Sequence, residues 1–282
     1  MRRWKVIGMA ALLCLGLSLL VTLLPRESGV GETLRFADAE EEKLLYMMAA
    51  EISPEYEMET LKMQAVIDRT RCRKAQEDQT KEPAQLTPRE LAQRWGENYS
   101  AYYEKFQKAI IATSGEVITC GGDYIYPEYH YLSNGSTRSM EEVYARSDFP
   151  YLQSVESSQD MEEPDYLNVF FIEKKDFQEK CRQTWNLPGE AIENVTLDGA
   201  GYVRELTVDG RTISGEEMQR LLDLPSCSFS IKDAGDEYRI VTKGIGHGFG
   251  VSIYGANEMA KMGATYASIL QYYYTGIEIS AE

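Results

Sequence analysis

The sequence KGIGHGFGVSIYGANEMAKMGATYASILQYYYTG, residues 243–276, places glycine at every second position of its first part. Alternating glycines in a strand remove the side chains from one face, permit positive φ and let a ligand or another backbone approach closely. His247, one of two histidines in the chain, lies on the opposite face. The pattern predicts a strand that is followed by helices at 254–263 and 265–274, with His247 either in the core or on a binding surface.

Loop motifs and charge exclude several classes of protein. The glycine stretch has no Gly-Lys-Ser/Thr, its spacing does not match G-x-G-x-x-G, and no G-x-S-x-G elbow occurs. The formal net charge is −16, whereas nucleic-acid binding takes its affinity largely from Lys and Arg. We therefore expect no nucleic-acid partner, and binding of an anionic polymer would rest on hydrogen bonds and on stacking, for which the 19 tyrosines are suited.

Helical and strand-like patterns come in separate runs along the chain. Asp209-Gly210, between two strand-like runs, is a strong hairpin signal. The expected elements are helices at 40–52, 57–78, 88–106, 139–145 and 176–185, strands within 116–132 and 168–174, and hairpin-like pairs at 201–214 and 228–244. These runs predict an α+β fold, mostly helical with antiparallel β-hairpins, after one N-terminal transmembrane helix.

Residues 1–26 predict a membrane anchor. Three basic residues within the first five precede an almost unbroken apolar run at 6–24, close to the about 20 residues that a spanning helix needs. We expect the basic residues in the cytoplasm and the rest of the chain outside, with a cleaved signal peptide as the alternative. Residues 27–39 are then a linker, and residues 40–282 form the extracytoplasmic domain.

The cysteines outside the anchor are widely spaced and form no C-x-x-C pair: Cys72, Cys120, Cys181 and Cys227. A zinc knuckle or a redox motif is therefore not expected. One or two disulfides and unpaired buried thiols are the two alternatives.

Four ordered regions of the chain resemble the stage II sporulation protein D family, which contains the sporulation engulfment lytic transglycosylase and related amidase enhancers. They are METLKMQAVIDRT at 58–70, YHYLSNGST at 129–137 with FPYLQSV at 149–155, GYVRELTVDGRTISGEEMQRLLDLPSCSF at 201–229, and the glycine–histidine stretch. The resemblance covers about residues 40–276. The chain departs from the family at Ile253 in place of Gln, Asn134 in place of Gly, and Arg71 in place of the usual Tyr.

The resemblance implies cleavage of peptidoglycan glycan between N-acetylmuramic acid and N-acetylglucosamine without water. The muramyl C6 hydroxyl closes on the anomeric carbon and leaves a 1,6-anhydro end. Because the nucleophile belongs to the substrate, one residue can act first as acid and then as base, and the second carboxylate of most glycosidases is not required. The resemblance also implies peptide-stripped glycan as substrate, and an N-acetylmuramoyl-L-alanine amidase and a membrane scaffold as partners.

Two glutamates are candidates for this acid/base. Glu51 ends the first helix after Tyr-Met-Met-Ala-Ala, where the negative end of the helix dipole and apolar neighbours favour the protonated form that a general acid needs. Glu59 lies in the first turn of the second helix, where the dipole favours the ionised form, and Lys62 follows three residues later. We expect Glu51 to be catalytic and keep Glu59 as the alternative, because the family motif contains both.

Polar residues of the 129–137 segment and of the glycine stretch are candidates for lining a substrate groove. These candidates are His130, Ser133, Gly135, Thr137, His247, Gly248, Ser252 and Tyr254. Bare backbone beside His247 would let a polysaccharide, or the helix that carries Glu51, come close. His130, His247 and Cys120 are zinc-ligand types, but two histidines without short spacing are a weak zinc pattern, and we expect neither a metal nor a cofactor.

Two other functions compete with a transglycosylase. The first is a non-catalytic cell-wall binding protein that activates an amidase, which predicts no glycan cleavage by the folded chain. The second is a metal hydrolase, which predicts stoichiometric metal and loss of activity with a chelator.

Overall fold

The computed structural model describes residues 35–282, and residues Phe36–Glu282 form one unit, the second of two into which the chain divides. The predicted anchor at 1–26 and most of the predicted linker at 27–39 lie outside the described residues. Within the described part, each helix is too short or too polar to cross a bilayer.

The second unit combines helices and sheets, which confirms the α+β class. The helices are α2 (Ala39–Glu51), α3 (Met58–Glu77), α4 (Pro88–Trp95), α5 (Tyr99–Ala112), α6 (Met140–Tyr144), α7 (Lys174–Trp185), α8 (Gly215–Leu222), α9 (Ile253–Lys261) and α10 (Tyr266–Tyr273), with 3-10 turns η1 (Gly96–Asn98), η2 (Ser158–Glu162) and η3 (Pro164–Tyr166). The strands are β1 (Glu116–Cys120), β2 (Asp123–Tyr124), β3 (Tyr129–His130), β4 (Leu167–Glu173), β5 (Ile192–Leu197), β6 (Val203–Val208), β7 (Arg211–Ser214), β8 (Phe229–Asp233), β9 (Glu237–Lys243), β10 (Val251–Ser252) and β11 (Glu278–Ala281).

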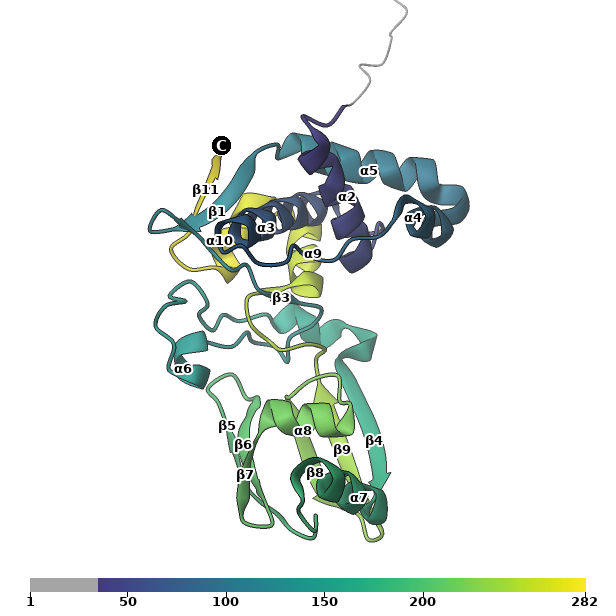
Figure 1. Cartoon of the computed structure of the whole chain (residues 1–282), viewed down its shortest axis with the longest axis vertical. Helices are drawn as coiled ribbons and strands as arrows, with labels where there is room; N and C mark the ends of the chain where they lie inside the picture. Colours follow the sequence, from purple (N-terminus) through teal and green to yellow (C-terminus); the bar gives the residue numbers. More distant parts are fainter. Residues whose placement is uncertain (1–34) are drawn as a thin grey trace, which may run out of the picture. The chain divides into compact units, whose positions relative to one another are not determined.

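Helix α3 lies at the centre of the first hydrophobic core (Figure 1). It contacts α2, α5, α9, α10 and β1, and its side chains Leu61, Met63 and Ile67 are fully buried. The preceding helix α2 begins at an N-cap, Asp38, whose carboxylate accepts from the Glu41 amide, and it ends three residues before Pro54. The expected helices at 40–52 and 57–78 are therefore confirmed.

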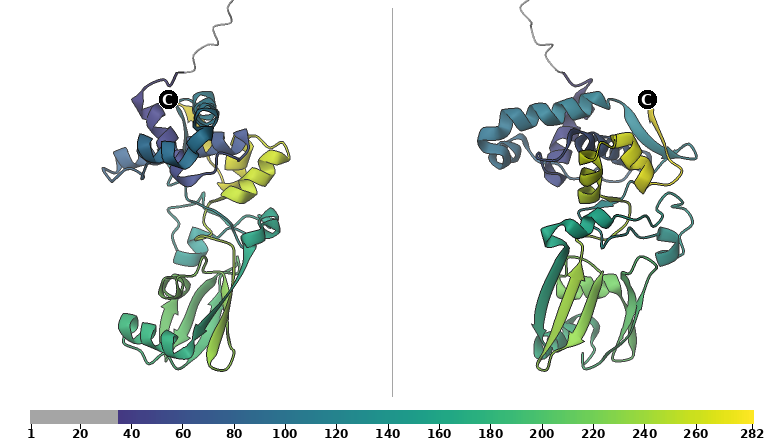
Figure 2. Two further views of the ribbon diagram at one scale, coloured as in Figure 1. Left: turned by 90° about the vertical axis from the view of Figure 1, so that its right-hand side faces the viewer. Right: turned by 180° about the vertical axis from the view of Figure 1, so that it is seen from behind.

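The second hydrophobic core lies between two antiparallel three-stranded sheets, with strand orders β4-β9-β8 and β5-β6-β7, and helices α7 and α8. Figure 2 shows these two helices beside the strands and away from α2–α5. The turn between β6 and β7 has φ of 47° at Asp209 and 81° at Gly210, as the predicted hairpin requires. Ser214 then forms a capping box with Glu217 and starts α8.

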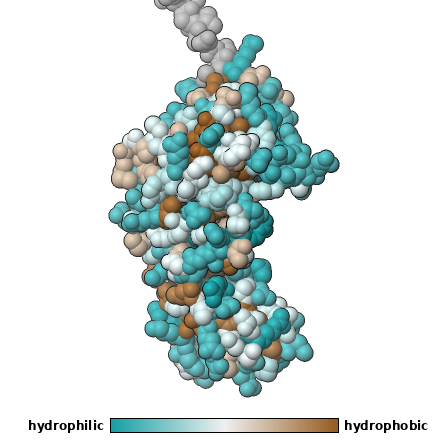
Figure 3. Space-filling model, turned by 90° about the vertical axis from the view of Figure 1, so that its left-hand side faces the viewer, coloured by the Kyte–Doolittle hydropathy of each residue, from teal (hydrophilic) through white to brown (hydrophobic). Residues whose placement is uncertain are grey.

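The face drawn in Figure 3 is mostly hydrophilic, with hydrophobic residues in small groups. Among the exposed apolar side chains are Phe171 on β4 and Leu197 on β5, both edge strands of their sheets.

The predicted strand over the alternating glycines is wrong. Residues 244–250 form an irregular segment, and only Val251–Ser252 pair as β10, in parallel with β3. All four glycines have positive φ, from 68° at Gly250 to 114° at Gly246, which a regular strand does not permit. The bare backbone does admit a close neighbour, but that neighbour is the chain's own segment 128–138.

Gly250 provides a direct test of this packing. A Cβ added there would lie 1.8 Å from the Glu128 carbonyl oxygen, whereas Gly276, with nearly the same φ of 69°, has nothing within 4 Å. Gly276→Ala should lower the free energy of unfolding by about 1–2 kcal/mol through φ alone. Gly250→Ala should cost about 1–3 kcal/mol more through the clash. Urea unfolding of both variants measures the difference, and equal losses would contradict the proposed backbone contact.

The predictions for residues 88–106, for residues 116–132 and for the cysteines are confirmed only in part. The helix expected at 88–106 breaks at Gly96, where φ is 50°, into α4 and α5. The strand-like segment 116–132 forms the short strands β1, β2 and β3, and the strands β5 and β11 were not expected. The four cysteines of the described part are free thiols, so the disulfide alternative does not apply.

Candidate functional site

Glu51 is the last residue of α2, as predicted. The Arg94 guanidinium donates from Nη1 to the carbonyl oxygens of Ala49 (2.6 Å) and Ala50 (3.2 Å), so a cation already compensates the negative end of this helix. The Glu51 side chain is 23% exposed and is therefore accessible from solvent.

The neighbours of the Glu51 carboxylate are polar, which corrects the apolar surroundings expected from the sequence. Arg71 Nη1 donates to both carboxylate oxygens, at 3.1 and 3.0 Å, and the Tyr129 hydroxyl donates to Oε2. Gln64 approaches Oε2 at 3.5 Å. The apolar residues before Glu51 pack into the core, while α3 and β3 present polar groups to the helix end.

Asp68 lies directly behind this group and is fully buried. Its Oδ1 accepts from Arg71 Nη1 (2.9 Å) and Gln64 Nε2 (3.2 Å), and its Oδ2 has no partner among the described residues. Burial and the charge of Glu51 together raise the pKa of Asp68 to about 7, against the opposing effect of Arg71. Glu51, Asp68, Arg71 and Tyr129 form one connected group, called the Glu51 cluster below.

The raised pKa of Asp68 predicts a specific pH dependence of stability. Its ordinary value is 3.8, so between about pH 4 and pH 7 the folded chain holds a proton that the unfolded chain has released. The contribution of Asp68 to the free energy of unfolding is therefore fully present below about pH 4 and is lost as the pH rises to 7. Wild type should therefore lose on the order of 2 kcal/mol relative to Asp68→Asn between pH 5 and pH 8. Urea unfolding of wild type and of Asp68→Asn at both pH values measures this change, and Asp236→Asn, a substitution of an exposed aspartate, is the control. A stability difference between wild type and Asp68→Asn that does not vary with pH would contradict the prediction.

Glu59, the alternative catalytic residue, has a carboxylate whose hydrogen bonds stabilise the fold. Its carboxylate accepts from Lys62 Nζ (2.7 Å) and from the backbone amide of Tyr266 (2.9 Å), the first residue of α10. Burial acts to raise the pKa of Glu59, but these two hydrogen bonds outweigh it and lower the pKa. Glu59 therefore holds α10 against α3 as an ionised carboxylate.

Two hollows flank the Glu51 cluster. The first, called the cationic cavity, has a volume of about 440 Å³ and is lined by Arg71, Lys74, Ala75, Thr80, Lys81, Pro83, Tyr126, Pro127, Glu128, Tyr129 and His247. The second, called the Trp95 hollow, has a volume of about 310 Å³ and is lined by residues 49–54, Arg94, Trp95 and Tyr102. Glu51 lines the second hollow, and its carboxylate contacts Arg71 and Tyr129 of the first, so the side chain adjoins both.

The two histidines lie side by side, with ring centroids 5.7 Å apart. His130 is buried beneath Gly246, and its Nδ1 lies 3.0 Å from the Phe249 carbonyl oxygen, which assigns the ring proton to Nδ1. Burial and the neighbouring His247 lower the pKa of His130 to about 3. The His247 side chain is 42% exposed and lines the cationic cavity, and its Nδ1 accepts from the Phe249 amide. Only His247 of this pair is thus placed to meet a ligand.

The remaining predicted binding residues are largely engaged inside the protein. Ser133 and Ser252 are fully buried and meet at Asp160, which accepts from the Ser133 amide and from the Ser252 hydroxyl, both at 2.9 Å. The Thr137 hydroxyl accepts from the Val155 amide at 2.9 Å. These contacts hold the 133–137 turn against the glycine stretch.

The other three predicted binding residues, Gly135, Gly248 and Tyr254, have different surroundings. Gly135 has a positive φ of 109° and faces Met161, and Gly248 packs against the Tyr202 ring. Tyr254 is half-buried at the start of α9, and its amide donates to the Tyr131 carbonyl oxygen. Binding of substrate by these residues stays a prediction.

A metal site finds no support in the described residues. Across residues 35–282, no three side chains of His, Cys, Asp or Glu lie close enough together to hold a metal ion. Cys120 is a free, half-buried thiol at the end of β1.

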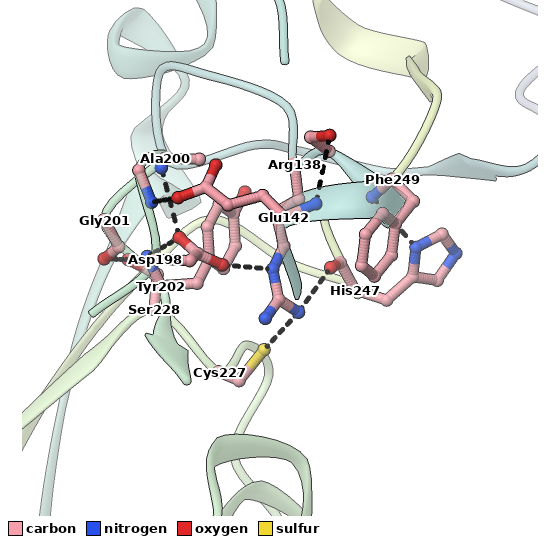
Figure 4. Close-up of polar contacts among 12 residues, drawn as sticks. Arg138, Glu142, Asp198, Ala200, Gly201, Tyr202, Cys227, Ser228, His247 and Phe249 are labelled. Atoms are coloured by element: carbon pink, nitrogen blue, oxygen red, sulfur yellow. Dashed lines mark hydrogen bonds and ion pairs between the residues drawn. The ribbon is translucent and has the colours of Figure 1, made fainter. Parts of the chain in front are cut away.

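Arg138, which the sequence did not single out, links the glycine stretch to the second core (Figure 4). Its side chain is fully buried, and its Nε donates to Asp198 Oδ2 at 2.7 Å. Its Nη1 donates to Glu216 (2.8 Å) and to the His247 carbonyl oxygen (3.3 Å), and its amide donates to the Gly248 carbonyl oxygen. This network fixes the backbone that presents His247.

Sequence reasoning also missed Asp68 and Arg71 as members of the Glu51 cluster, and it missed Gln64, which lies beside the cluster. A signal was present, because these polar residues are spaced by four and three positions and so share one face of α3 with the buried side chains. Arg138 carried no such signal, since its partners Asp198 and Glu216 are distant in the sequence.

Comparison with known proteins gives consistent matches. Residues 38–120 match the family model described as SpoIID, Stage II sporulation protein. The stage II sporulation protein D of Bacillus subtilis is 36% identical over 193 residues, which cover 68% of this chain and 55% of that protein. The protein of the same name from Bacillus amyloliquefaciens is 32% identical over 256 residues, 85% of this chain and 74% of that protein. A protein named amidase enhancer from Bacillus subtilis is 22% identical over 231 residues, 62% of this chain and 32% of that protein.

Proposed function

Because this chain belongs to the stage II sporulation protein D family, we propose that it is a membrane-anchored lytic transglycosylase of cell-wall remodelling during sporulation engulfment. It would cleave the bond between N-acetylmuramic acid and N-acetylglucosamine in peptide-stripped peptidoglycan and leave 1,6-anhydro ends. Glu51 would be its single acid/base.

The observation that carries this proposal is the position of Glu51 between two hollows. A glycan strand needs binding sites on both sides of the bond that is cleaved, and the cationic cavity and the Trp95 hollow offer them. Tyrosine side chains line both hollows, Tyr126 and Tyr129 the first and Tyr102 the second, and tyrosine rings suit stacking on sugar rings. Glu59 lacks this setting, because its carboxylate holds α10.

The chemistry needs one carboxyl group that changes its protonation state. Protonated Glu51 donates its proton to the glycosidic oxygen, the bond from that oxygen to the muramyl C1 breaks, and N-acetylglucosamine leaves as an alcohol. The muramyl C6 oxygen then bonds to C1, and its proton returns to the Glu51 carboxylate. Tyr129 orients the carboxylate through its hydroxyl, and no atom of water enters the products.

Membrane attachment and partners extend the same proposal. The apolar run at 6–24 would anchor the chain, with the second unit outside the cytoplasm. An N-acetylmuramoyl-L-alanine amidase would supply peptide-stripped glycan, and a membrane scaffold would hold the two together.

A specific observation favours a second candidate, a non-catalytic activator of the amidase. Arg71 Nη1 donates to both oxygens of Glu51, so the carboxylate is engaged within the protein and is not free to face a glycosidic oxygen. The distant similarity to a protein named amidase enhancer points the same way.

Mass spectrometry of the products separates the two candidates. The purified full chain in detergent is incubated with peptidoglycan strands that an amidase has stripped of peptides. New 1,6-anhydro muramyl ends support the transglycosylase. Absence of cleavage by a folded chain, together with faster peptide release when chain and amidase are mixed, supports the activator.

A further inference from the structure

The cationic cavity is unusual for so acidic a protein. The chain has a net charge of −16, yet Arg71, Lys74 and Lys81 line this one hollow together with His247, against one carboxylate, Glu128. Three cations that converge on about 440 Å³ favour an anionic ligand group there.

The lysines of the cavity differ in their partners. Lys74 pairs with Glu77 (2.8 Å) and Asp78 (3.2 Å) and lies over the Tyr126 ring. Lys81 is exposed and forms no ion pair with any residue of the described chain. Lys81 therefore has its full charge available for a ligand.

Arg71 has hydrogen-bond donors that no residue of the described chain uses. All its hydrogen bonds, to Glu51, Asp68 and Tyr129, use the single nitrogen Nη1. Its Nε and Nη2 make no hydrogen bond to residues 35–282, and the side chain is 27% exposed where it lines the cavity. The free donors of a guanidinium form the fork that binds a carboxylate through two parallel hydrogen bonds.

We propose that the cationic cavity binds the lactyl carboxylate of the muramyl residue, through Arg71 and Lys81, and that this contact selects glycan whose stem peptide has been removed. The inference rests on the proposed function and deepens it. In peptide-bearing glycan the lactyl carboxyl is an amide, which carries no charge and cannot accept a bidentate pair from Arg71. In stripped glycan it is the one anionic group of each disaccharide.

The same contact would prepare Glu51 for catalysis. Arg71 is shared between the cavity and Glu51, so a substrate carboxylate competes with Glu51 for the guanidinium. When Arg71 turns toward the substrate, the Glu51 carboxylate loses its guanidinium partner and is free to face the glycosidic oxygen. Substrate recognition and release of the catalytic carboxyl group are then one event.

Binding to a non-cleaving variant tests the inference. Full chain carrying Glu51→Gln, in detergent, is titrated calorimetrically with stripped muramyl oligosaccharide and with the same oligosaccharide whose carboxyls are amidated with methylamine. We expect at least about 10-fold tighter binding of the free acid, as hydrogen bonds to charged groups warrant. Adding Arg71→Met with Lys81→Met should abolish the preference, whereas adding Lys108→Met, an exposed lysine of α5, should leave it.

Three results would overturn the inference. They are equal affinity for both oligosaccharides, a preference that survives the Arg71→Met and Lys81→Met changes, and equally tight, Arg71-dependent binding of a peptide-bearing muropeptide, which would assign the cavity to peptide carboxylates. Thermal unfolding of each variant confirms that it is folded. Cleavage by the wild type is scored separately on both oligosaccharides, so a preference in binding without any anhydro ends would reject the transglycosylase and leave the carboxylate site standing.

Discussion

Glu51→Gln should lower the rate of 1,6-anhydro end formation by at least about 100-fold, because glutamine keeps the shape of the side chain but can neither give nor take the proton. The amide of the new side chain still offers hydrogen-bonding groups to Arg71 and Tyr129, so the fold and the two hollows should persist. Chromatography of the products at matched enzyme concentration measures the rate, and circular dichroism confirms the fold.

Glu59→Gln is the matched control, since it removes the same charge eight residues later in the chain. Its carboxylate binds Lys62 and the Tyr266 amide, so the variant should lose about 1–2 kcal/mol of stability and keep its activity. If Glu59→Gln abolished cleavage while Glu51→Gln did not, the assignment of the acid/base to α2 would be wrong.

Arg138→Met should lower the free energy of unfolding by about 3–5 kcal/mol, the cost of leaving a buried charge without its partner. Asp198 is almost fully buried, and its Oδ2 would lose the Arg138 Nε donor. The guanidinium also lies over the Tyr202 and Phe249 rings, at 5.0 and 4.9 Å, so packing is lost as well. Urea unfolding measures the change.

Arg146→Met is the control for this prediction. Arg146 also pairs with an aspartate, Asp148, but both side chains are more than half exposed, so the loss should stay below about 1 kcal/mol. Equal effects of Arg138→Met and Arg146→Met would show that the Arg138 network does not stabilise the link between the glycine stretch and the second core.

Local signals in the sequence were sufficient for much of the fold. Asp209-Gly210 marked a hairpin, and Pro54 ends the first helix, because each acts within a few residues. The glycine stretch was misassigned for a physical reason. Alternating glycines fit the period of a strand, and their positive φ follows from contact with segment 128–138, more than a hundred residues away.

The site was predictable only in outline. Glu51 was found because a helix end can be read from the sequence, but its partners come from α3 and from Tyr129, 78 residues further on. Buried polar residues such as Arg138 resemble surface residues in a sequence, since only the tertiary fold brings Asp198 and Glu216 to them. Prediction therefore reached the catalytic candidate and not the charges around it.

A crystal structure of the Glu51→Gln chain with a stripped tetrasaccharide of alternating N-acetylglucosamine and N-acetylmuramic acid tests the central claim most directly. The account predicts sugar rings in both the cationic cavity and the Trp95 hollow, with a glycosidic oxygen about 3 Å from the side-chain amide at position 51. A tetrasaccharide bound with its glycosidic oxygens remote from position 51 would contradict it.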